Sequence, residues 1–174
     1  DQAQVTVLNQ TPTLFYQFAD IATVQNKKRK LKSLRYIIFG GEALNLSQLK
    51  NWFDYYGSNQ PQLINMYGIT ETTVHVTYKL IKEQDLEESA DIGIIIPDLT
   101  AYVLDSNQSP LPIGAVGELY IGGAGLARGY LRKPELTKQR FIDNPFQTAK
   151  EKQQGKNSRL YKTGDLVQWL PKGE

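Results

Sequence analysis

The sequence predicts an α/β protein in which a parallel-sheet portion over residues 1–90 precedes a small β-rich subdomain over residues 91–174. Two observations lead to this fold class. In the first portion, short apolar runs alternate with segments whose apolar residues recur at helical spacing. From about residue 90, short strand-like runs are separated by turns rich in Pro, Gly and Asn. We therefore expect strands with helical crossovers first and a compact β structure after them.

Three apolar runs of strand length lie in the first portion, and a helix is expected after each of the first two. The strands are "VTVLN" at 5–9, "LRYIIFGG" at 34–41 and "QLINMYG" at 62–68. Pro12 introduces a helical pattern over 13–24, and Ser47 is placed to cap a helix over 48–56.

Because parallel strands joined by helices place their sites at the carboxyl ends of the strands, three strand ends are candidate site positions. They are Asn9, the pair Gly40–Gly41, and the stretch from Asn65 to Tyr67.

The second portion contains three strand-like segments, at 100–105, 117–123 and 158–170. One short helix is predicted at 133–141. The polar, glycine-punctuated segment 146–159 is predicted to be an exposed loop.

Composition excludes several classes of function. Lys and Arg number 20 and Asp and Glu 18, a formal net charge of +2, which gives no reason to expect nucleic acid or an anionic membrane as a partner. The absence of cysteine excludes disulfides and thiolate metal sites, and it fits the cytoplasmic location that we expect. The single histidine, His75, excludes a His-based metal site. No apolar run approaches the roughly 20 residues of a membrane-spanning helix.

Both ends of the sequence predict an excerpt of a longer chain. The first residues, "DQAQVTVLNQ", have neither an initiator Met nor the basic and apolar stretches of a signal peptide. The last residues, "QWLPKGE", stop at a turn signal where a further strand is expected.

Two motifs invite a functional interpretation that their details do not support. "GGAGLARG" at 122–129 has the spacing G-x-G-x-x-x-G rather than the dinucleotide-binding G-x-G-x-x-G, so it is interpreted as a turn between strands, with Arg128 available to a carboxylate or to the backbone. "NKKRK" at 26–30 is more typical of a solvated loop than of a nucleic-acid site, since the acidic "EQDLEES" at 83–89 nearly offsets it.

The stretch "NMYGITETTVHVTY" at 65–78 carries the side chains best suited to chemistry. Glu71 follows a strand end, and a single carboxylate there suits Mg²⁺, which keeps most of its waters and bridges to phosphates. Thr70 is able to donate to a phosphate oxygen, and Tyr67, held by a turn at Gly68, offers an aromatic face to a base. Taken alone, these residues fit an ordinary turn with a capping Glu equally well.

Three motifs resemble those of the adenylation domains of nonribosomal peptide synthetases, a class of adenylate-forming enzymes. "NMYGITE" is similar to N-x-Y-G-x-T-E, "GELYIGGAGLARGYL" to G-E-L-x-I-x-G-x-G-(V/L)-A-R-G-Y-L, and "YKTGDL" to Y-(R/K)-T-G-D-L. They occur in family order, and "RKPELTKQRFIDNPF" at 132–146 resembles the linking segment. The resemblance covers essentially the whole chain and implies that residues 1–174 are part of one adenylation domain, whose β-rich subdomain is a distorted barrel.

The resemblance implies a reaction and a set of partners. An amino-acid carboxylate attacks the α-phosphate of ATP, which gives an aminoacyl adenylate and pyrophosphate. The aminoacyl group then passes to the phosphopantetheine thiol of a carrier domain. The implied ligands and partners are the amino acid, ATP, Mg²⁺, and the peptidyl carrier and condensation domains of the same synthetase. Catalysis of such a displacement depends mainly on positioning and charge neutralisation.

The same resemblance implies roles for single residues. Thr70 holds the α-phosphate and Glu71 holds Mg²⁺, and these two are the catalytic residues. Tyr67, in its turn at Gly68, stacks on adenine, while Asp165 accepts hydrogen bonds from the ribose hydroxyls. The base is lined by the backbone of "GGEA" and by an amide side chain, that is, by Gly40, Gly41, Glu42, Ala43 and Asn65.

Alignment by motif places six residues in the pocket for the substrate side chain: Asn9, Ile38, Gly40, Met66, Val74 and His75. Its apolar members form a wall of moderate size, and Asn9 and His75 offer hydrogen-bonding tips. A small side chain with a methyl and a hydroxyl suits such a pocket, since a site built to bond a hydroxyl rejects analogues that lack it. The order of the six residues also resembles the signature of threonine-activating domains, so we predict L-threonine.

Several family features are absent from the sequence. They are the Ser/Thr/Gly-rich phosphate loop, the Asp that holds the substrate amino group, the hinge and the C-terminal lysine, so residues 1–174 alone are expected to be inactive. Two alternatives remain open. The first is an acyl- or aryl-CoA ligase of the same superfamily, and the second is a non-catalytic module that keeps the fold.

Overall fold

The computed structural model describes residues 3–25, 31–87 and 91–174. It divides into two compact units. The first consists of Asp1–Tyr67 and Thr77–Gly93, and the second of Gly68–Val76 and Ile94–Glu174. The chain therefore passes between the units three times. The basic run at 26–30, interpreted above as a solvated loop, lies outside the described residues.

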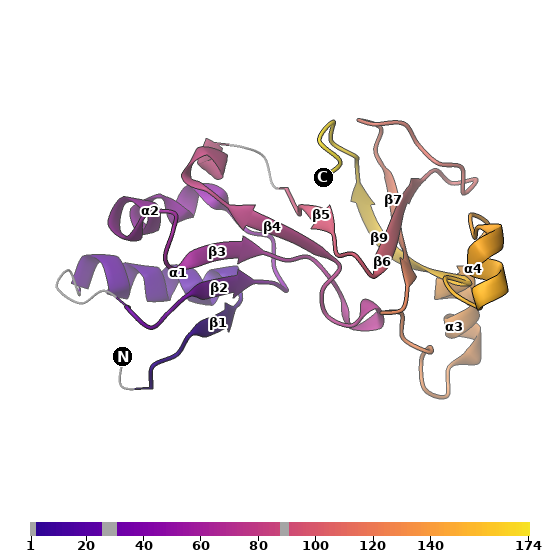
Figure 1. Cartoon of the computed structure of the whole chain (residues 1–174), viewed down its shortest axis with the longest axis horizontal. Helices are drawn as coiled ribbons and strands as arrows, with labels where there is room; N and C mark the ends of the chain where they lie inside the picture. Colours follow the sequence, from indigo (N-terminus) through magenta and orange to yellow (C-terminus); the bar gives the residue numbers. More distant parts are fainter. Residues whose placement is uncertain (1–2, 26–30, 88–90) are drawn as a thin grey trace. The chain divides into compact units, whose positions relative to one another are not determined.

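The first unit is built on the predicted parallel strands (Figure 1). Strands β1 (Val7–Gln10), β2 (Tyr36–Phe39) and β3 (Gln62–Asn65) are parallel neighbours in that order. Strand β4 (Thr77–Ile81), which the sequence patterns did not predict, pairs with β3 in the antiparallel direction. The three predicted strands are confirmed, with shorter bounds.

Two helices cover one face of this sheet (Figure 1). Helix α1 (Pro12–Asp20) begins with Pro at its first turn and continues into a π-helical turn, η1 (Ile21–Gln25). Helix α2 (Lys50–Tyr56) follows a 3₁₀ turn, η2 (Leu46–Leu49), and a further 3₁₀ turn, η4 (Glu83–Glu87), follows β4. The core lies between helices and sheet, where the fully buried Trp52 packs with its ring centroid 4.9 Å from that of Phe15.

The cap before α2 differs from the prediction. Ser47 was expected to cap the helix, but the N-cap residue of η2 is Asn45, whose Oδ1 accepts from the Ser47 amide at 3.1 Å. The Ser47 hydroxyl also donates to Asn45 Oδ1, at 2.8 Å. Both residue types are good N-caps, and the 3₁₀ turn that precedes α2 moves the start two residues upstream.

The second unit contains an antiparallel sheet with the strand order β6-β7-β9-β8. These strands are β6 (Leu99–Leu104), β7 (Gly117–Gly123), β8 (Phe141–Asp143) and β9 (Arg159–Val167). The unit also holds η3 (Thr70–Thr72), β5 (Ile94–Ile95), α3 (Pro134–Arg140) and α4 (Ala149–Gln154). Among the described residues the sheet is open, with β6 and β8 at its edges, so the expected distorted barrel is replaced by a sheet that does not close.

Two segments of the second unit differ from their predictions. The segment 146–159 was expected to be a loop, but it contains α4, which begins with a capping box formed by Thr148 and Glu151. The turn at 122–129 lies between β7 and α3, not between two strands. Helix α4 is short and bounded by polar residues, so its apolar pattern is too weak to predict it. Helix α3, by contrast, matches the helix predicted at 133–141.

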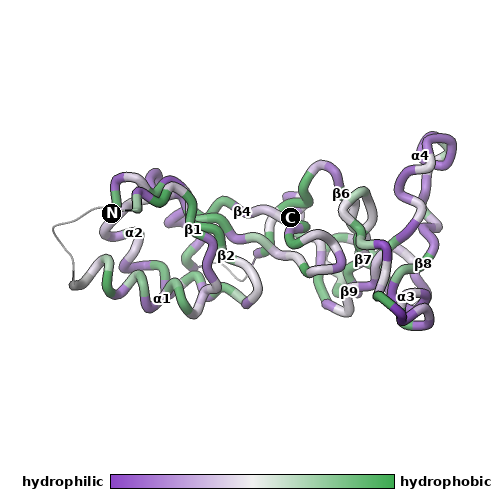
Figure 2. Tube along the Cα trace, turned by 90° about the horizontal axis from the view of Figure 1, so that it is seen from below, coloured by the Kyte–Doolittle hydropathy of each residue, from purple (hydrophilic) through white to green (hydrophobic). Residues whose placement is uncertain are grey.

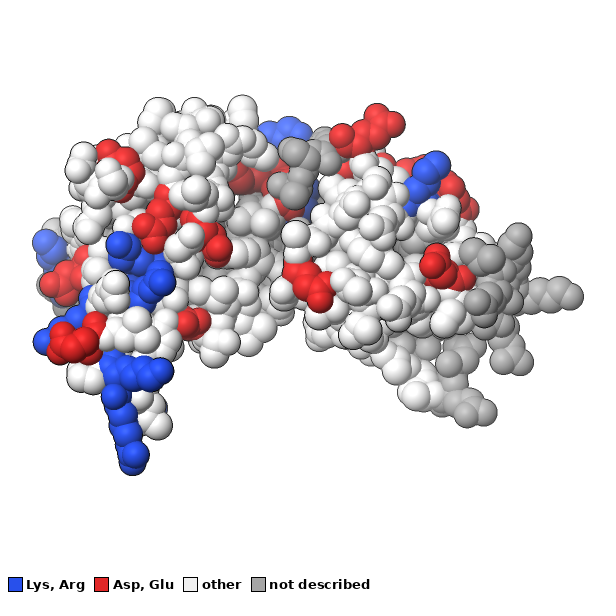
Figure 3. All heavy atoms as spheres, turned by 180° about the vertical axis from the view of Figure 1, so that it is seen from behind, with Lys and Arg blue, Asp and Glu red and all other residues white. Residues whose placement is uncertain are grey.

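Hydropathy and charge follow the elements. The strands are largely hydrophobic, whereas α3 and α4 are hydrophilic (Figure 2). Lys and Arg side chains gather at the end of the second unit that carries α3 and α4 (Figure 3). In α3 the order of charge, Glu135 in the first turn and Lys138 and Arg140 in the last, matches the helix dipole. Within the described ranges, none of the helices has the length and apolar character needed to cross a membrane.

Candidate functional site

The sequence-predicted site residues fall into two groups, one in each unit. The first unit holds Asn9, Ile38, Gly40, Gly41, Glu42, Ala43, Asn65, Met66 and Tyr67. The second unit holds Gly68, Thr70, Glu71, Val74, His75 and Asp165.

In the first unit, strand register brings the three predicted strand ends together. Asn9 lies beside Ile38 in the β1–β2 pair, and Phe39 lies beside Asn65 in the β2–β3 pair. The amide of Met66 donates to the carbonyl of Phe39 at 3.0 Å, which extends the β2–β3 pairing past the strand end. Asn9, Ile38, Asn65 and Met66 thus lie at the carboxyl ends of neighbouring parallel strands.

Alternation along the strands settles which face Asn9 and Ile38 occupy. The buried Phe39 belongs to the core beneath α1 and α2, so Ile38 points to the opposite face. Asn9 is its neighbour in register and shares that face. Asn9 is exposed and Ile38 is half-buried, so an amide and an aliphatic side chain lie side by side on the face opposite α1 and α2.

The "GGEA" segment after β2 also supports helix α1. Gly41 has a φ of +83°, a backbone conformation that favours glycine. The Glu42 carboxylate accepts from the Thr13 amide at 3.1 Å and so satisfies one free N–H at the start of α1. Hydrogen bonding to Thr13 lowers the pKa of the Glu42 carboxyl. The role predicted for the backbone of Gly41, Glu42 and Ala43, which is to line the base, stays a prediction.

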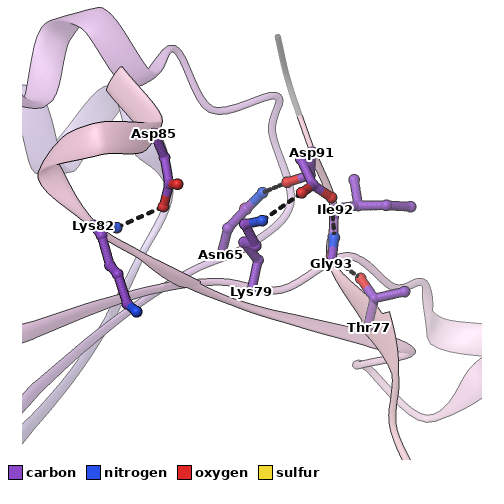
Figure 4. A network of polar contacts seen from close by, with 8 residues as sticks. All are labelled: Asn65, Thr77, Lys79, Lys82, Asp85, Asp91, Ile92 and Gly93. Carbon is purple, nitrogen blue, oxygen red and sulfur yellow. Dashed lines mark hydrogen bonds and ion pairs between the residues drawn. The ribbon is translucent and has the colours of Figure 1, made fainter. Parts of the chain in front are cut away.

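A polar network fixes the end of β3 (Figure 4). Asn65 Nδ2 donates to the backbone carbonyl of Asp91 at 3.1 Å. The Asp91 carboxylate in turn pairs with Lys79 Nζ at 2.6 Å, both side chains being largely buried, and accepts from the Gly93 amide at 2.7 Å. Next to it, the Thr77 hydroxyl donates to the carbonyl of Ile92 at 2.5 Å. This network orients the Asn65 amide, because its nitrogen is committed to Asp91.

In the second unit, residues 68–76 form a tight turn that folds back on Gly68. A β-carbon at Gly68 would lie 2.7 Å from His75 Cα and closer still to the Val74 carbonyl oxygen. Thr73 and Val74 both have positive φ, +60° and +71°, and a β-branched residue rarely adopts that conformation. The Thr73 hydroxyl donates to the carbonyl of Gly125 at 2.6 Å, which helps to hold the turn.

Glu71, in η3, is held by groups from a distant part of the sequence. Its backbone carbonyl accepts from the Ala127 amide at 2.8 Å. Its Oε1 accepts from the Tyr130 hydroxyl at 2.5 Å, and the hydroxyls of Tyr130 and Tyr161 are 3.1 Å apart. Thr70, the preceding residue, is exposed.

The hydrogen bonds set the charge of this cluster. The hydrogen bond from Tyr130 holds the pKa of the Glu71 carboxyl below its usual range. Burial, and then the hydrogen bond to Glu71, raise the pKa of Tyr130. At neutral pH Glu71 is therefore a carboxylate and Tyr130 a neutral donor.

This arrangement fits Mg²⁺ better than a metal that needs an all-protein site. In the described parts of the chain, no group of three or more His, Cys, Asp and Glu side chains is placed to hold a metal ion. A single ionised carboxylate suits Mg²⁺, which is commonly bound by one or two carboxylates together with water and substrate phosphates. Glu71 meets that requirement.

Asp165 lies at an irregularity of β9. The pairing of β7 with β9 shifts between Glu118 and Tyr120, so that residues 163–165 bulge from the ladder. The Asp165 amide donates to the Thr163 hydroxyl at 3.0 Å, and Gly164 has a φ of +83°. The bulge leaves Asp165 exposed.

The two predicted pocket residues in the second unit differ in their surroundings. Val74 is 61% exposed. His75 is half-buried, and its Nδ1 is fully buried without a hydrogen-bond partner among the described residues. A buried polar atom of this kind is costly to leave unpaired, which makes it a candidate for a ligand hydrogen bond.

Comparison with known proteins decides the family. A family model described as AMP-binding enzyme matches residues 1–131.

The chain belongs to the AMP-binding enzyme family.

Relatives within the family are large synthetases. The chain is 52% identical over 165 residues to the dimodular nonribosomal peptide synthase of Bacillus subtilis, covering 94% of this chain and 7% of the relative. It is 50% identical over 170 residues to malpinin synthetase of Mortierella alpina, covering 97% of this chain and 2% of the relative. The chain thus spans a small part of the length of these relatives. The predicted membership among the adenylation domains of nonribosomal peptide synthetases is confirmed.

Solved structures share the fold. A holo nonribosomal peptide synthetase protein with adenylation and PCP domains, bound to a vinylsulfonamide inhibitor, matches with a TM-score of 0.83 and 25% identity, over 99% of this chain and 28% of that chain. An artificially fused adenylation–PCP di-domain from Klebsiella oxytoca matches with a TM-score of 0.78 and 23% identity, over 99% of this chain and 32% of that chain. The α/β fold class is confirmed.

Sequence reasoning missed the residues that hold the site residues in place. Tyr130 and Tyr161 lie within two of the family motifs, but no role was predicted for them, nor for Thr77 and Asp91. Tyr130 is separated from Glu71 by 59 residues, and no local pattern reports a contact at that separation. The available signal was the occurrence of Tyr130 and Tyr161 inside two of the family motifs.

Proposed function

We propose that this chain provides part of an amino-acid-activating adenylation site in a nonribosomal peptide synthetase. The observation that carries the proposal is the strand register of the first unit, which places Asn9 beside Ile38 and brings Asn65 to the same sheet edge. A pocket for a substrate side chain and a lining for a base are thereby supported at the carboxyl ends of parallel strands.

The nucleotide is assigned to residues of the three motifs. Tyr67 stacks on adenine, and the backbone of Gly41, Glu42 and Ala43 lines the base together with Asn65. Asp165, exposed at its bulge, accepts from the ribose hydroxyls.

The phosphates are assigned to the 3₁₀ turn η3. The Thr70 hydroxyl donates to the α-phosphate, and the Glu71 carboxylate holds Mg²⁺. When bound, Mg²⁺ would neutralise charge on the phosphates during the displacement.

The proposed reaction begins when a carboxylate oxygen of the amino acid attacks the α-phosphorus of ATP. The bond between the α-phosphorus and its bridging oxygen breaks, and pyrophosphate leaves with that oxygen. The phosphopantetheine thiol of a carrier domain then attacks the acyl carbon and AMP leaves. Peptidyl carrier and condensation domains are the proposed partners.

L-Threonine is the proposed substrate. The side chain of Ile38 provides apolar contact for a methyl group, and the neighbouring Asn9 provides an amide for a hydroxyl. The motif resemblance also assigns His75 to this pocket, as a second hydrogen-bonding partner of the hydroxyl. Gly40, Met66 and Val74 complete the proposed pocket.

Amino-acid-dependent ATP–pyrophosphate exchange by the full-length protein, measured across the proteinogenic amino acids, tests this proposal. We expect exchange to be fastest with threonine. A preference for valine or serine would contradict the substrate assignment. Exchange with no amino acid, together with activity on carboxylic acids and coenzyme A, would identify an acyl- or aryl-CoA ligase instead.

A further inference from the structure

We propose that Tyr130 is a positioning residue that orients the Glu71 carboxylate for its divalent cation. The inference rests on the proposed function, in which Glu71 holds Mg²⁺, and it adds a residue to which the motif resemblance gave no role. The Tyr130 hydroxyl lies 2.5 Å from Glu71 Oε1. That contact leaves the other oxygen, Oε2, as the one we assign to the cation.

The direction of each hydrogen bond follows from counting protons. A tyrosine hydroxyl has one proton and an ionised carboxylate has none, so Tyr130 must donate to Glu71. The 3.1 Å contact between the two hydroxyls allows either direction by itself. Since the Tyr130 proton is used, we assign Tyr161 as the donor and Tyr130 as the acceptor, which gives a directed chain from Tyr161 through Tyr130 to Glu71.

Tyr130 is itself firmly placed. Its amide donates to the Thr137 hydroxyl at 2.9 Å, which ties it to α3. Its ring packs edge-on against Phe141, with centroids 5.8 Å apart. The preceding Gly129 has a φ of +143°, and a β-carbon there would collide with the Thr137 side chain. The Tyr130 hydroxyl is therefore held in place by the contacts of its own backbone, of its ring and of the preceding glycine.

The backbone on both sides of the contact is also fixed. Ala127 donates its amide to the Glu71 carbonyl at 2.8 Å. Arg159 then donates from Nη2 to the carbonyl of Ala127 and from Nη1 to that of Arg128, each at 3.0 Å. Neither end of the Tyr130–Glu71 hydrogen bond is on a freely moving segment, so the bond can select one carboxylate orientation before any cation arrives.

The affinity of the protein for a divalent cation reports this role directly. We would titrate the full-length protein with Mn²⁺ in the presence of α,β-methylene ATP and follow free Mn²⁺ by electron paramagnetic resonance. Residues that orient a metal ligand commonly contribute about 10–100-fold to metal affinity. For Tyr130→Phe we expect about a tenfold loss of Mn²⁺ affinity, at the low end of that range, with nucleotide binding in EDTA unchanged.

Tyr102→Phe is the matched control. Like Tyr130→Phe, this variant removes one tyrosine hydroxyl from the second unit. Tyr102 stacks on Phe146 with ring centroids 4.7 Å apart, a contact that the phenylalanine ring keeps. We expect it to bind Mn²⁺ as the wild type does. Equal losses in the two variants would contradict the proposal.

Two further variants separate the possible failures. If Tyr130→Phe lowers the thermal midpoint but leaves Mn²⁺ affinity unchanged, Tyr130 is only a structural link and the inference is wrong. If Glu71→Gln also leaves Mn²⁺ affinity unchanged, the proposed role of Glu71 fails as well. Should Tyr130→Phe not fold, Tyr161→Phe decides the matter: a smaller loss of affinity supports the directed chain, and no loss contradicts it.

Discussion

At the scale of single residues, the turn that carries Thr70 and Glu71 depends on a glycine. Thr73 and Val74 both hold positive φ, which costs of order 1–3 kcal/mol per residue and persists only where the surroundings enforce it. Gly68 is part of those surroundings, because the returning chain occupies the space of a β-carbon. Strain of this kind is common at functional sites.

Gly68→Ala is expected to destabilise the protein by about 1–3 kcal/mol, the usual range for overpacking. The reason is that the new β-carbon would collide with backbone atoms of Val74 and His75, which cannot move aside as a flexible side chain can. Gly114→Ala is the control: Gly114 has a φ of +84° but no atom within 4 Å of a β-carbon, so it tests conformational strain without a clash. Denaturant unfolding of both variants measures the difference. Equal or smaller destabilisation by Gly68→Ala would contradict the account of the turn.

His75 is the residue on which the substrate assignment depends most. Its buried Nδ1 needs a hydrogen-bond partner, and the hydroxyl of threonine would provide one. His75→Leu removes that atom, so we expect the full-length variant to lose its preference for threonine in favour of a more apolar amino acid. Competition in ATP–pyrophosphate exchange measures the preference. Unchanged selectivity would remove His75 from the pocket.

The proposed Mg²⁺ ligand, Glu71, can be tested by a single substitution. Glu71→Gln keeps the shape of the side chain but removes the negative charge that attracts Mg²⁺ to this position. We expect the variant to need a higher Mg²⁺ concentration for half-maximal exchange while its circular dichroism stays that of the wild type. Wild-type Mg²⁺ dependence would show that Glu71 has another role.

At the scale of elements, helix α4 shows what the hydrophobic pattern misses. It is a six-residue helix with no buried residue, so it has no apolar face to predict it. The signal in the sequence was a capping box: Thr148 accepts from the Glu151 amide at 3.2 Å, and Glu151 accepts from the Thr148 amide at 2.8 Å. Strands β1, β2 and β3, by contrast, were predictable because their apolar runs are bounded by turn residues.

The capping box predicts an acid-sensitive helix. Hydrogen bonds from Thr148 lower the pKa of the Glu151 carboxyl below its ordinary value of 4.5. Because the folded pKa is depressed, the stabilisation is present above that ordinary value and is lost as the pH falls through the folded pKa. The protection of the α4 amides, measured as their exchange rate relative to the intrinsic rate at the same pH, should therefore fall in acid. Glu151→Gln, which keeps an acceptor without the charge, should abolish this pH dependence, and its persistence would rule out Glu151 as the cause.

At the scale of the whole chain, local sequence patterns predicted which segments are helices and strands. The candidate site residues, in contrast, are held in place by contacts with residues far away in the sequence. Strand–helix alternation was sufficient to place Asn9, Gly40 and Asn65 at neighbouring strand ends, because parallel register is set by buried residues such as Phe39.

The rest could not be predicted, because it depends on partners that only folding brings near. Asn65 is oriented by Asp91, 26 positions away, and Glu71 by Tyr130, 59 positions away. The family resemblance assigned Asn65 and Glu71 their roles but gave none to Asp91 or Tyr130. Sequence motifs therefore identified the candidate ligand-binding residues, and the structure identified the residues that hold them.

The activity that we propose for the full-length protein is the conversion of an amino acid and ATP into an aminoacyl adenylate. The most direct test is mass spectrometry of the product that the full-length protein forms from ATP, Mg²⁺ and an equimolar mixture of the proteinogenic amino acids. We expect an adenylate with the mass of threonyl-AMP, which the Glu71→Gln variant forms less readily. No aminoacyl adenylate from this mixture, together with an acyl adenylate when carboxylic acids that lack an amino group are supplied instead, would show that this activity is wrongly assigned.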